Sequence, residues 1–223
     1  MLKKNLPAFH VMRNSIIFSV TILLMVSLAD QVMGQGGAEQ LLREGSRFQA
    51  VDDTTDRAAE LYQQVMRSYP KSTEAEAAQY FVGGYYSKKF FIIEKRSNVQ
   101  DWGSMNRAEQ ELYAYVGRYP NGIYLADAYY SLALIAWRRG YLENARKLWL
   151  LMKEAAARDG KVYIYRVTWS PANDDLIQGY CDTNALSDVG LNLLTKYASF
   201  DQTVSELTNW ARTNCRAPKY NVK

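Results

Sequence analysis

Histidine and cysteine, which carry much of the acid–base, nucleophilic and metal chemistry of proteins, are scarce in this chain, with one histidine and two cysteines. Its single histidine is His10, which lies in an N-terminal segment with the features of a cleavable leader. Without histidine, the remaining chain cannot form Ser–His or Cys–His nucleophilic pairs or histidine-ligated zinc. It also contains no phosphate-binding loop of the GxxxxGK type. We therefore predict no catalytic residue, no metal site and no cofactor.

One catalytic spacing does occur, at Ser68 to Lys71, which reads S-x-x-K as in penicillin-binding enzymes. In those enzymes the lysine follows the serine by one helical turn. Here Pro70 lies inside that turn, and proline breaks a helix. The companion SDN and KTG motifs are absent. We interpret this stretch as the end of a helix.

Paired carboxylates can support hydrolysis without histidine. Acidic residues lie close together at Glu74 and Glu76 and at Asp174 and Asp175, and the 17 tyrosines and five tryptophans could form a carbohydrate platform. However, acids that are close in sequence usually share a solvated face, and aromatic residues at helical spacings are usually core. A glycan-binding or carboxylate-based hydrolytic protein therefore stays the alternative function.

The N-terminus predicts export. Three basic residues precede an apolar run over 16–29, and Ser27 and Ala29 provide the small-x-small exit of a cleavage site. These features are typical of a secretory signal peptide, predicted over 1–29, and a flexible mature N-terminus is predicted over 30–37. The alternative is a membrane anchor, although the run is shorter than the roughly 20 residues that cross a bilayer.

Removal of the leader changes the charge balance. The whole chain has 27 basic and 23 acidic residues, and three of the basic ones lie in the leader. The mature chain would keep 24 basic and 23 acidic residues, a net charge of +1. Because nucleic-acid binding needs a basic surface, we exclude nucleic acid as a partner.

The mature chain keeps two cysteines, Cys181 and Cys215. In an oxidising compartment such a pair predicts one disulfide, which would close the C-terminal region. The alternative is two buried thiols, since free cysteine is often a core residue.

The chain repeats itself at an offset of 50 residues. Proline cannot continue a helix and disfavours helical geometry in the residue before it, so helices are predicted over 57–70 and 107–120. Ser72 or Thr73 is then predicted to cap the next helix, with Glu76 in a capping-box position. The repeated pairs are Arg57 and Arg107, Ala58 and Ala108, Tyr69-Pro70 and Tyr119-Pro120, Ala78 and Ala128, and Tyr80 and Tyr130.

These spacings resemble the tetratricopeptide repeat, whose second helix has a small residue, an aromatic residue four later and a proline twelve later. Ala58, Tyr62 and Pro70 match this pattern, and Ala108, Leu112 and Pro120 match it with leucine substituted. The resemblance covers residues 38–157, which would form about three units. It implies an all-α fold, a short helical-hairpin solenoid, with residues 158–223 as a C-terminal helical cap.

The endings YPKS and YPNG further resemble exported bacterial members of this family, of the BamD-like outer-membrane assembly type and the Tol-Pal cell-division coordinator type. The resemblance implies a periplasmic protein that acts in cell-envelope assembly and reaches the membrane only through its partners. No cysteine lies near the predicted leader exit, which departs from the lipid-anchored members.

Two stretches do not follow the repeat. The connection after Tyr86 is about a dozen residues longer than the family has, and the excess over 87–104 predicts either an extended helix pair with a loop or a binding insertion. KVYIYRVTWSP at 161–171 predicts an irregular stretch or a strand. Two helices should follow it, the second capped by Asp201.

The predicted function is a non-enzymatic scaffold that binds another envelope protein or peptide. In the family, the first helix of each unit lines the concave binding face. Tyrosines there would give rigid amphipathic area, and a cation could hold a partner carboxylate. The alternative is that the tyrosines pack between helices. The positions that the resemblance carries over are Tyr80, Lys88, Asp127, Tyr130, Leu134, Trp137 and Arg138.

Overall fold

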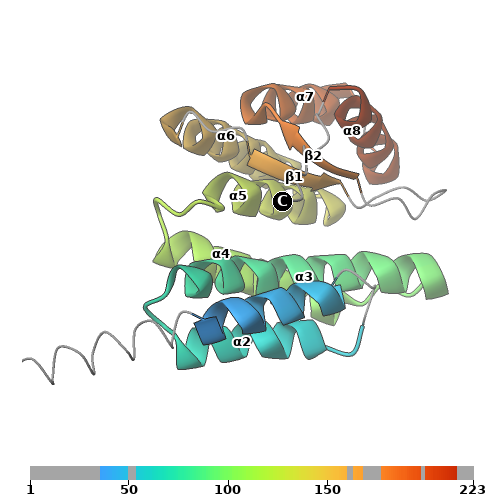
Figure 1. Ribbon diagram of the computed structural model, residues 1–223. Coiled ribbons are helices and arrows are strands. Elements are labelled where there is room, and N and C mark those ends of the chain that lie inside the picture. The colour runs from blue at the N-terminus through green and yellow to red at the C-terminus, as the bar shows by residue number, and fades with distance from the viewer. Residues whose placement is uncertain (1–35, 50–53, 160–162, 168–176, 197–198, 215–223) are drawn as a thin grey trace, which may run out of the picture.

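The computed structural model describes residues 36–49, 54–159, 163–167, 177–196 and 199–214, and it is predominantly helical (Figure 1). A helix over 36–49 comes first, so residues 36 and 37 are helical and not part of a flexible N-terminus as predicted. The helices that follow are α2 (Arg57–Ser68), α3 (Thr73–Ser97), α4 (Trp102–Arg118), α5 (Leu125–Arg138), α6 (Leu142–Asp159), α7 (Thr183–Lys196) and α8 (Phe200–Asn214).

Two short strands interrupt the helices. β1 (Tyr163–Val167) and β2 (Ile177–Cys181) pair antiparallel, with Tyr163 opposite Cys181 and Val167 opposite Ile177. The region predicted as a C-terminal helical cap therefore contains a small sheet as well as helices, and the strand interpretation of 161–171 is the correct one for Tyr163–Val167. β1 reads YIYRV, and this concentration of β-branched and aromatic residues favours a strand over a helix.

Helices that follow one another in the chain pack against one another. α3 lies against both α2 and α4, and α5 lies between α4 and α6 (Figure 1). α6 packs on α7, which packs in turn on α8. Most of the packing is therefore between neighbours in sequence, as expected of consecutive helical hairpins.

The two tyrosine–proline steps adopt the same backbone geometry. α2 ends at Ser68 and α4 at Arg118, because in each case a proline follows two residues later. The amide of Tyr69 donates to the Val65 carbonyl, and the amide of Tyr119 donates to the Tyr115 carbonyl, each at 2.8 Å. The predicted helical segments are thus confirmed except for their last two residues.

The repeat also extends to the core. Ala58 and its counterpart Ala108 are fully buried, as are Tyr62 and its counterpart Leu112. Glycines on the preceding helices make room for the larger pair. A Cβ on Gly45 would lie 2.6 Å from the Tyr62 ring, and a Cβ on Gly83 would lie 2.7 Å from Leu112 Cγ. Each hairpin therefore closes on a glycine that lets a large side chain of its second helix approach.

The excess residues over 87–104 lengthen α3 to Ser97 and form a short turn before α4. Asn98 ends α3 in the left-handed region, with φ at 54°. Asp101 caps α4 by accepting hydrogen bonds from the amide and the hydroxyl of Ser104. The interpretation as an extended helix pair is confirmed.

Ser72 caps α3, because its hydroxyl accepts from the Ala75 amide at 3.2 Å. Glu76 takes no part in a capping box; its carboxylate reaches to the next turn of the chain instead. Asp201 does not cap α8 as predicted, because the helix already begins at Phe200 and Asp201 lies in its first turn.

Some predictions fall outside the described residues. These are the leader over 1–29, the acidic pair Asp174 and Asp175, and Cys215, so the Cys181–Cys215 disulfide stays a prediction. Among the residues that the structure describes, no helix combines the length and apolar character needed to cross a bilayer.

Candidate functional site

α3 and α5, the first helices of two successive hairpins, lie in contact with each other. Each carries a stripe of mostly half-buried side chains, and on α5 these recur every three or four residues. We call these stripes together the α3–α5 face. It comprises Tyr80, Phe91 and Glu94 of α3, and Asp127, Ser131, Leu134 and Arg138 of α5.

An aromatic cluster forms one end of the α3–α5 face. The Tyr80 ring stacks on the Tyr124 ring, with centroids 4.8 Å apart and planes within 4°. Phe81 and Tyr115 contact Tyr80 at 5.6 and 5.9 Å. Tyr80 and Tyr124 are both half-buried, so this end of the face offers aromatic area and two phenol groups.

Asp127 lies in the first turn of α5, beside this cluster, and is only 8% exposed. Burial raises the pKa of its carboxyl to about 8. After burial, the Asp127 charge is the main cause that raises the pKa values of the Tyr80, Tyr124 and Tyr130 hydroxyls. The carboxylate thus lies near three phenol groups. Among the described residues it has no hydrogen-bond donor and no opposite charge.

The two predicted binding cations are already engaged within the protein. The Lys88 ammonium donates to the Gln49 carbonyl at 2.6 Å, which joins α3 to the helix over 36–49. The Arg138 guanidinium pairs with the Glu94 carboxylate, which joins α5 to α3. Both residues therefore connect the first helices of neighbouring hairpins, a role that the 50-residue repeat did not reveal.

Tyr130 and Trp137 lie in the core between α5 and the helices behind it. The Tyr130 ring meets the fully buried Trp149 ring edge-on at 5.2 Å, and Trp137 is 2% exposed. Leu134 is half-buried and packs against the same core. The interpretation of tyrosines as packing residues fits Tyr130, whereas Tyr80 and Leu134 keep exposed surface.

The C-terminal helix bounds the other end of the α3–α5 face. The Phe200 ring, at the first residue of α8, stacks on the Phe91 ring of α3 with centroids 6.1 Å apart. Arg138 lies over the Phe200 ring at 5.5 Å and over the Trp102 ring at 6.0 Å. These contacts pack the start of α8 against this end of the face.

Glu76 fixes the turn that leads into α5. Its Oε1 accepts from the Tyr115 hydroxyl at 2.9 Å and from the Ile123 amide at 2.7 Å. The Tyr115 hydroxyl also accepts from the Tyr124 amide at 2.9 Å. These bonds hold the position of Tyr124, and thus of the Tyr80–Tyr124 stack. Sequence analysis missed this role because the partners lie 39 or more residues apart.

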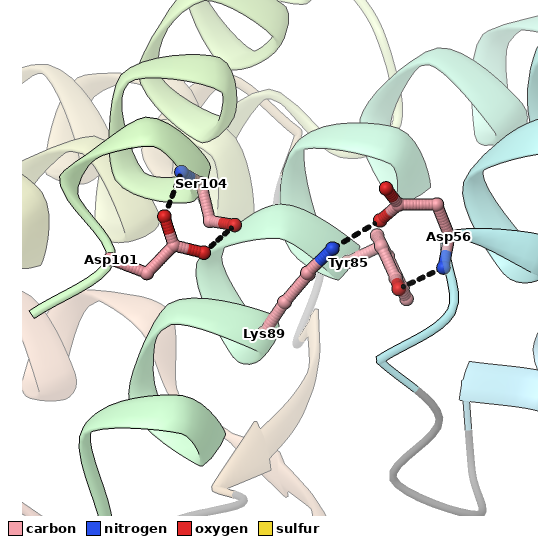
Figure 2. A network of polar contacts seen from close by, with 5 residues as sticks. All are labelled: Asp56, Tyr85, Lys89, Asp101 and Ser104. Carbon is pink, nitrogen blue, oxygen red and sulfur yellow. Dashed lines mark hydrogen bonds and ion pairs between the residues drawn. The ribbon is translucent and has the colours of Figure 1, made fainter. Parts of the chain in front are cut away.

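A second polar network braces the opposite end of the hairpins (Figure 2). The Lys89 ammonium binds the Asp56 carboxylate at 2.7 Å, and the Asp56 amide donates to the Tyr85 hydroxyl at 2.9 Å. Asp56 has φ at 66°, a left-handed conformation that costs energy in a non-glycine residue. Its contacts with Lys89 and Tyr85 thus stabilise the packing of α3 against the start of α2. Hydrogen bonds from Ser104, aided by the nearby Lys89, lower the pKa of Asp101.

The described residues provide little for metal or hydrolytic chemistry. Within them, no group of three or more His, Cys, Asp or Glu side chains could hold a metal ion. The Glu76 oxygen that faces the cluster is occupied by two donors. Glu74 has one buried oxygen without a hydrogen-bond partner among these residues.

No protein-family model matches the chain, and no match is found among curated proteins or among solved structures. The candidate site is therefore defined by the geometry of the α3–α5 face alone.

Proposed function

We propose that this protein is a non-enzymatic scaffold built as a short tetratricopeptide-like array, and that it binds a polypeptide partner on the α3–α5 face. The observation that carries the proposal is the half-buried Tyr80–Tyr124 stack, which joins α3 to the residue directly before α5. Aromatic residues with exposed edges are the side chains that most often anchor a protein partner.

The repeated architecture supports the same function. Two turns with matching hydrogen bonds and two glycine contacts with matching geometry support an array of similar stacked units. Such stacks offer an extended face of adjacent first helices, which suits a peptide or a helix of another protein. The predicted leader would place this scaffold in the cell envelope, as a periplasmic protein.

The proposal predicts that the α3–α5 face is needed for binding and that the exposed surface of α6 around Leu150 is not. The test is capture of partners from crosslinked envelope membranes by the wild type, by Leu134→Lys and by Leu150→Lys. Leu134 lies on the α3–α5 face, and Leu150 lies on α6 and is 46% exposed. Both substitutions add the same charge and the same stem.

We expect Leu134→Lys to abolish capture of a partner that the wild type and Leu150→Lys retain. Thermal melting by circular dichroism verifies that both variants are folded. Equal capture by the two folded variants would contradict the proposal.

One observation favours the alternative of a glycan-handling protein. Asp127 is a carboxyl with a pKa of about 8 beside three tyrosines, and such a group is protonated and able to donate near neutral pH. Incubation with purified peptidoglycan tests this alternative. The absence of both binding and reaction products would exclude this alternative. Binding that is lost in Asp127→Asn would favour it over the scaffold.

A further inference from the structure

The α3–α5 face contains a buried acid whose charge, once it ionises, is not compensated by any described residue. Asp127 is more than nine-tenths buried and has neither a hydrogen-bond donor nor a cation opposite it among the described residues. An ionised carboxylate in such a place is costly unless an opposite charge reaches it. The fold nevertheless holds an acid here, where an apolar residue would suit the core better.

The nearby cations of α3 and α5 do not reach Asp127. Lys88 binds the Gln49 carbonyl, Lys89 binds Asp56, and Arg138 binds Glu94. The sequence had suggested that cations on this face would hold a partner carboxylate. The contacts indicate the opposite polarity: the cations are used within the protein, and the acid is left without a partner.

The surroundings of Asp127 suit a cation. Tyr124, Asp127 and Tyr130 follow one another at intervals of three residues at the start of α5, which places them on one side of the helix, and the Tyr80 ring stacks on Tyr124. Phenol oxygens can accept hydrogen bonds from an ammonium or a guanidinium. The Tyr80–Tyr124 stack adds aromatic faces, which attract cations. A sugar hydroxyl could also bond here, but it would not neutralise the carboxylate.

We propose that Asp127, with the phenol groups of Tyr80 and Tyr124, forms a subsite for a lysine or arginine side chain of the polypeptide partner. This inference rests on the proposed scaffold function and specifies the ligand chemistry of its binding face. The cation would enter beside the stacked rings and place its N–H groups on the Asp127 carboxylate.

The test begins with selection of peptides from a random twelve-residue phage-displayed library on the full-length protein. Selected peptides are then synthesised in two forms, with each arginine either kept or replaced by citrulline, which has the same shape and no charge. Lysine is replaced by norleucine in the same way. Dissociation constants are measured for the wild type and for Asp127→Asn.

We expect the selected peptides to share a basic residue, and Asp127→Asn to weaken the charged form at least about tenfold, as for a charge-assisted hydrogen bond. The neutral form should bind both proteins equally within about twofold, since the substitution leaves the shape of the site intact. Asp188→Asn is the matched control, because Asp188 is an exposed acid on α7 that pairs with Lys153.

Two results would overturn the inference, and they differ in whether the proposed scaffold function is also refuted. In the first, the selected peptides no longer bind Leu134→Lys, but they lack basic residues or bind Asp127→Asn as well as the wild type. This result would support the scaffold function and refute the cation subsite. A library that gives no binder sensitive to Leu134→Lys would refute both.

Discussion

The hydroxyl of Tyr115 in α4 donates a hydrogen bond to the carboxylate of Glu76 in α3, and it accepts one from the Tyr124 amide. One buried phenol thus connects three consecutive elements of the chain. Because α5 begins directly after Tyr124, this hydroxyl also positions the aromatic end of the α3–α5 face.

Tyr115→Phe should therefore destabilise the protein. The substitution keeps the ring in the core but leaves the Tyr124 amide without its acceptor and removes one donor to Glu76. We expect a loss of about 1–3 kcal/mol in the free energy of unfolding, measured by urea denaturation. Tyr113→Phe is the control, since Tyr113 is 41% exposed on the same helix. Equal effects of the two variants would contradict this role.

Gly122→Ala should be destabilising for a steric reason. A Cβ at Gly122 would lie 2.3 Å from the Tyr115 hydroxyl oxygen and 2.6 Å from Glu76 Oε1. We expect a cost of about 1–3 kcal/mol and a lower melting temperature. Gly117→Ala, in α4, meets nothing within 4 Å and should instead stabilise the helix by up to about 1 kcal/mol. If Gly122→Ala and Gly117→Ala changed the melting temperature in the same direction, the described turn would be contradicted.

Asp127 should make stability depend on pH. Its folded pKa of about 8 lies above its ordinary value of 3.8, so the folded state binds more protons between these two values. Stability should therefore fall as the pH rises through that window, and Asp127→Asn should remove this loss. The three neighbouring phenols, Tyr80, Tyr124 and Tyr130, have raised pKa values and stay neutral throughout.

The measurement is urea denaturation of the wild type and Asp127→Asn at pH 5, 7 and 9. The advantage of the variant should grow with pH, by at most about 1.4 kcal/mol for each unit up to pH 8. A difference that stays constant across the three pH values would mean that the Asp127 carboxyl titrates at its ordinary pKa.

Arg138→Met tests whether Arg138 is structural. The Arg138–Glu94 pair joins α5 to α3, and both side chains are about one-fifth exposed. We expect Arg138→Met to cost about 1–3 kcal/mol, since it leaves Glu94 half-buried and unpaired. Arg43→Met breaks the solvent-exposed pair with Glu39 and should cost less than about 1 kcal/mol. A negligible effect of Arg138→Met would return this residue to the candidates for partner binding.

Much of the helical organisation was predictable from local pattern. Pro70 and Pro120 mark helix ends because the restriction is contained in the residue itself. The 50-residue offset identified Ala58 and Ala108 as buried because a small residue at a helix crossing has a local periodic signature. The length of α3 was also predictable in part, since the extra residues over 87–104 favour a longer helix.

The candidate site was only partly predictable. Tyr80, Asp127 and Leu134 lie on α3 and α5, and the repeat did not indicate that the partners of Lys88 and Arg138 come from other helices. The same holds for Glu76, whose local sequence predicts a capping box. Tertiary packing decides whether a side chain bonds to a nearby amide or to a distant hydroxyl, and sequence spacing does not show which partner it takes.

The contact between Phe200 and Phe91 has a consequence for the order of folding. The helical hairpins join residues close in the chain, so their closure loses little chain entropy, whereas this contact ties the last described helix to a helix of the second hairpin. We expect α8 to dock late during folding and to be among the first elements to detach under mild denaturant. Amide hydrogens of α8 should accordingly exchange with deuterium sooner than those of α4 and α5.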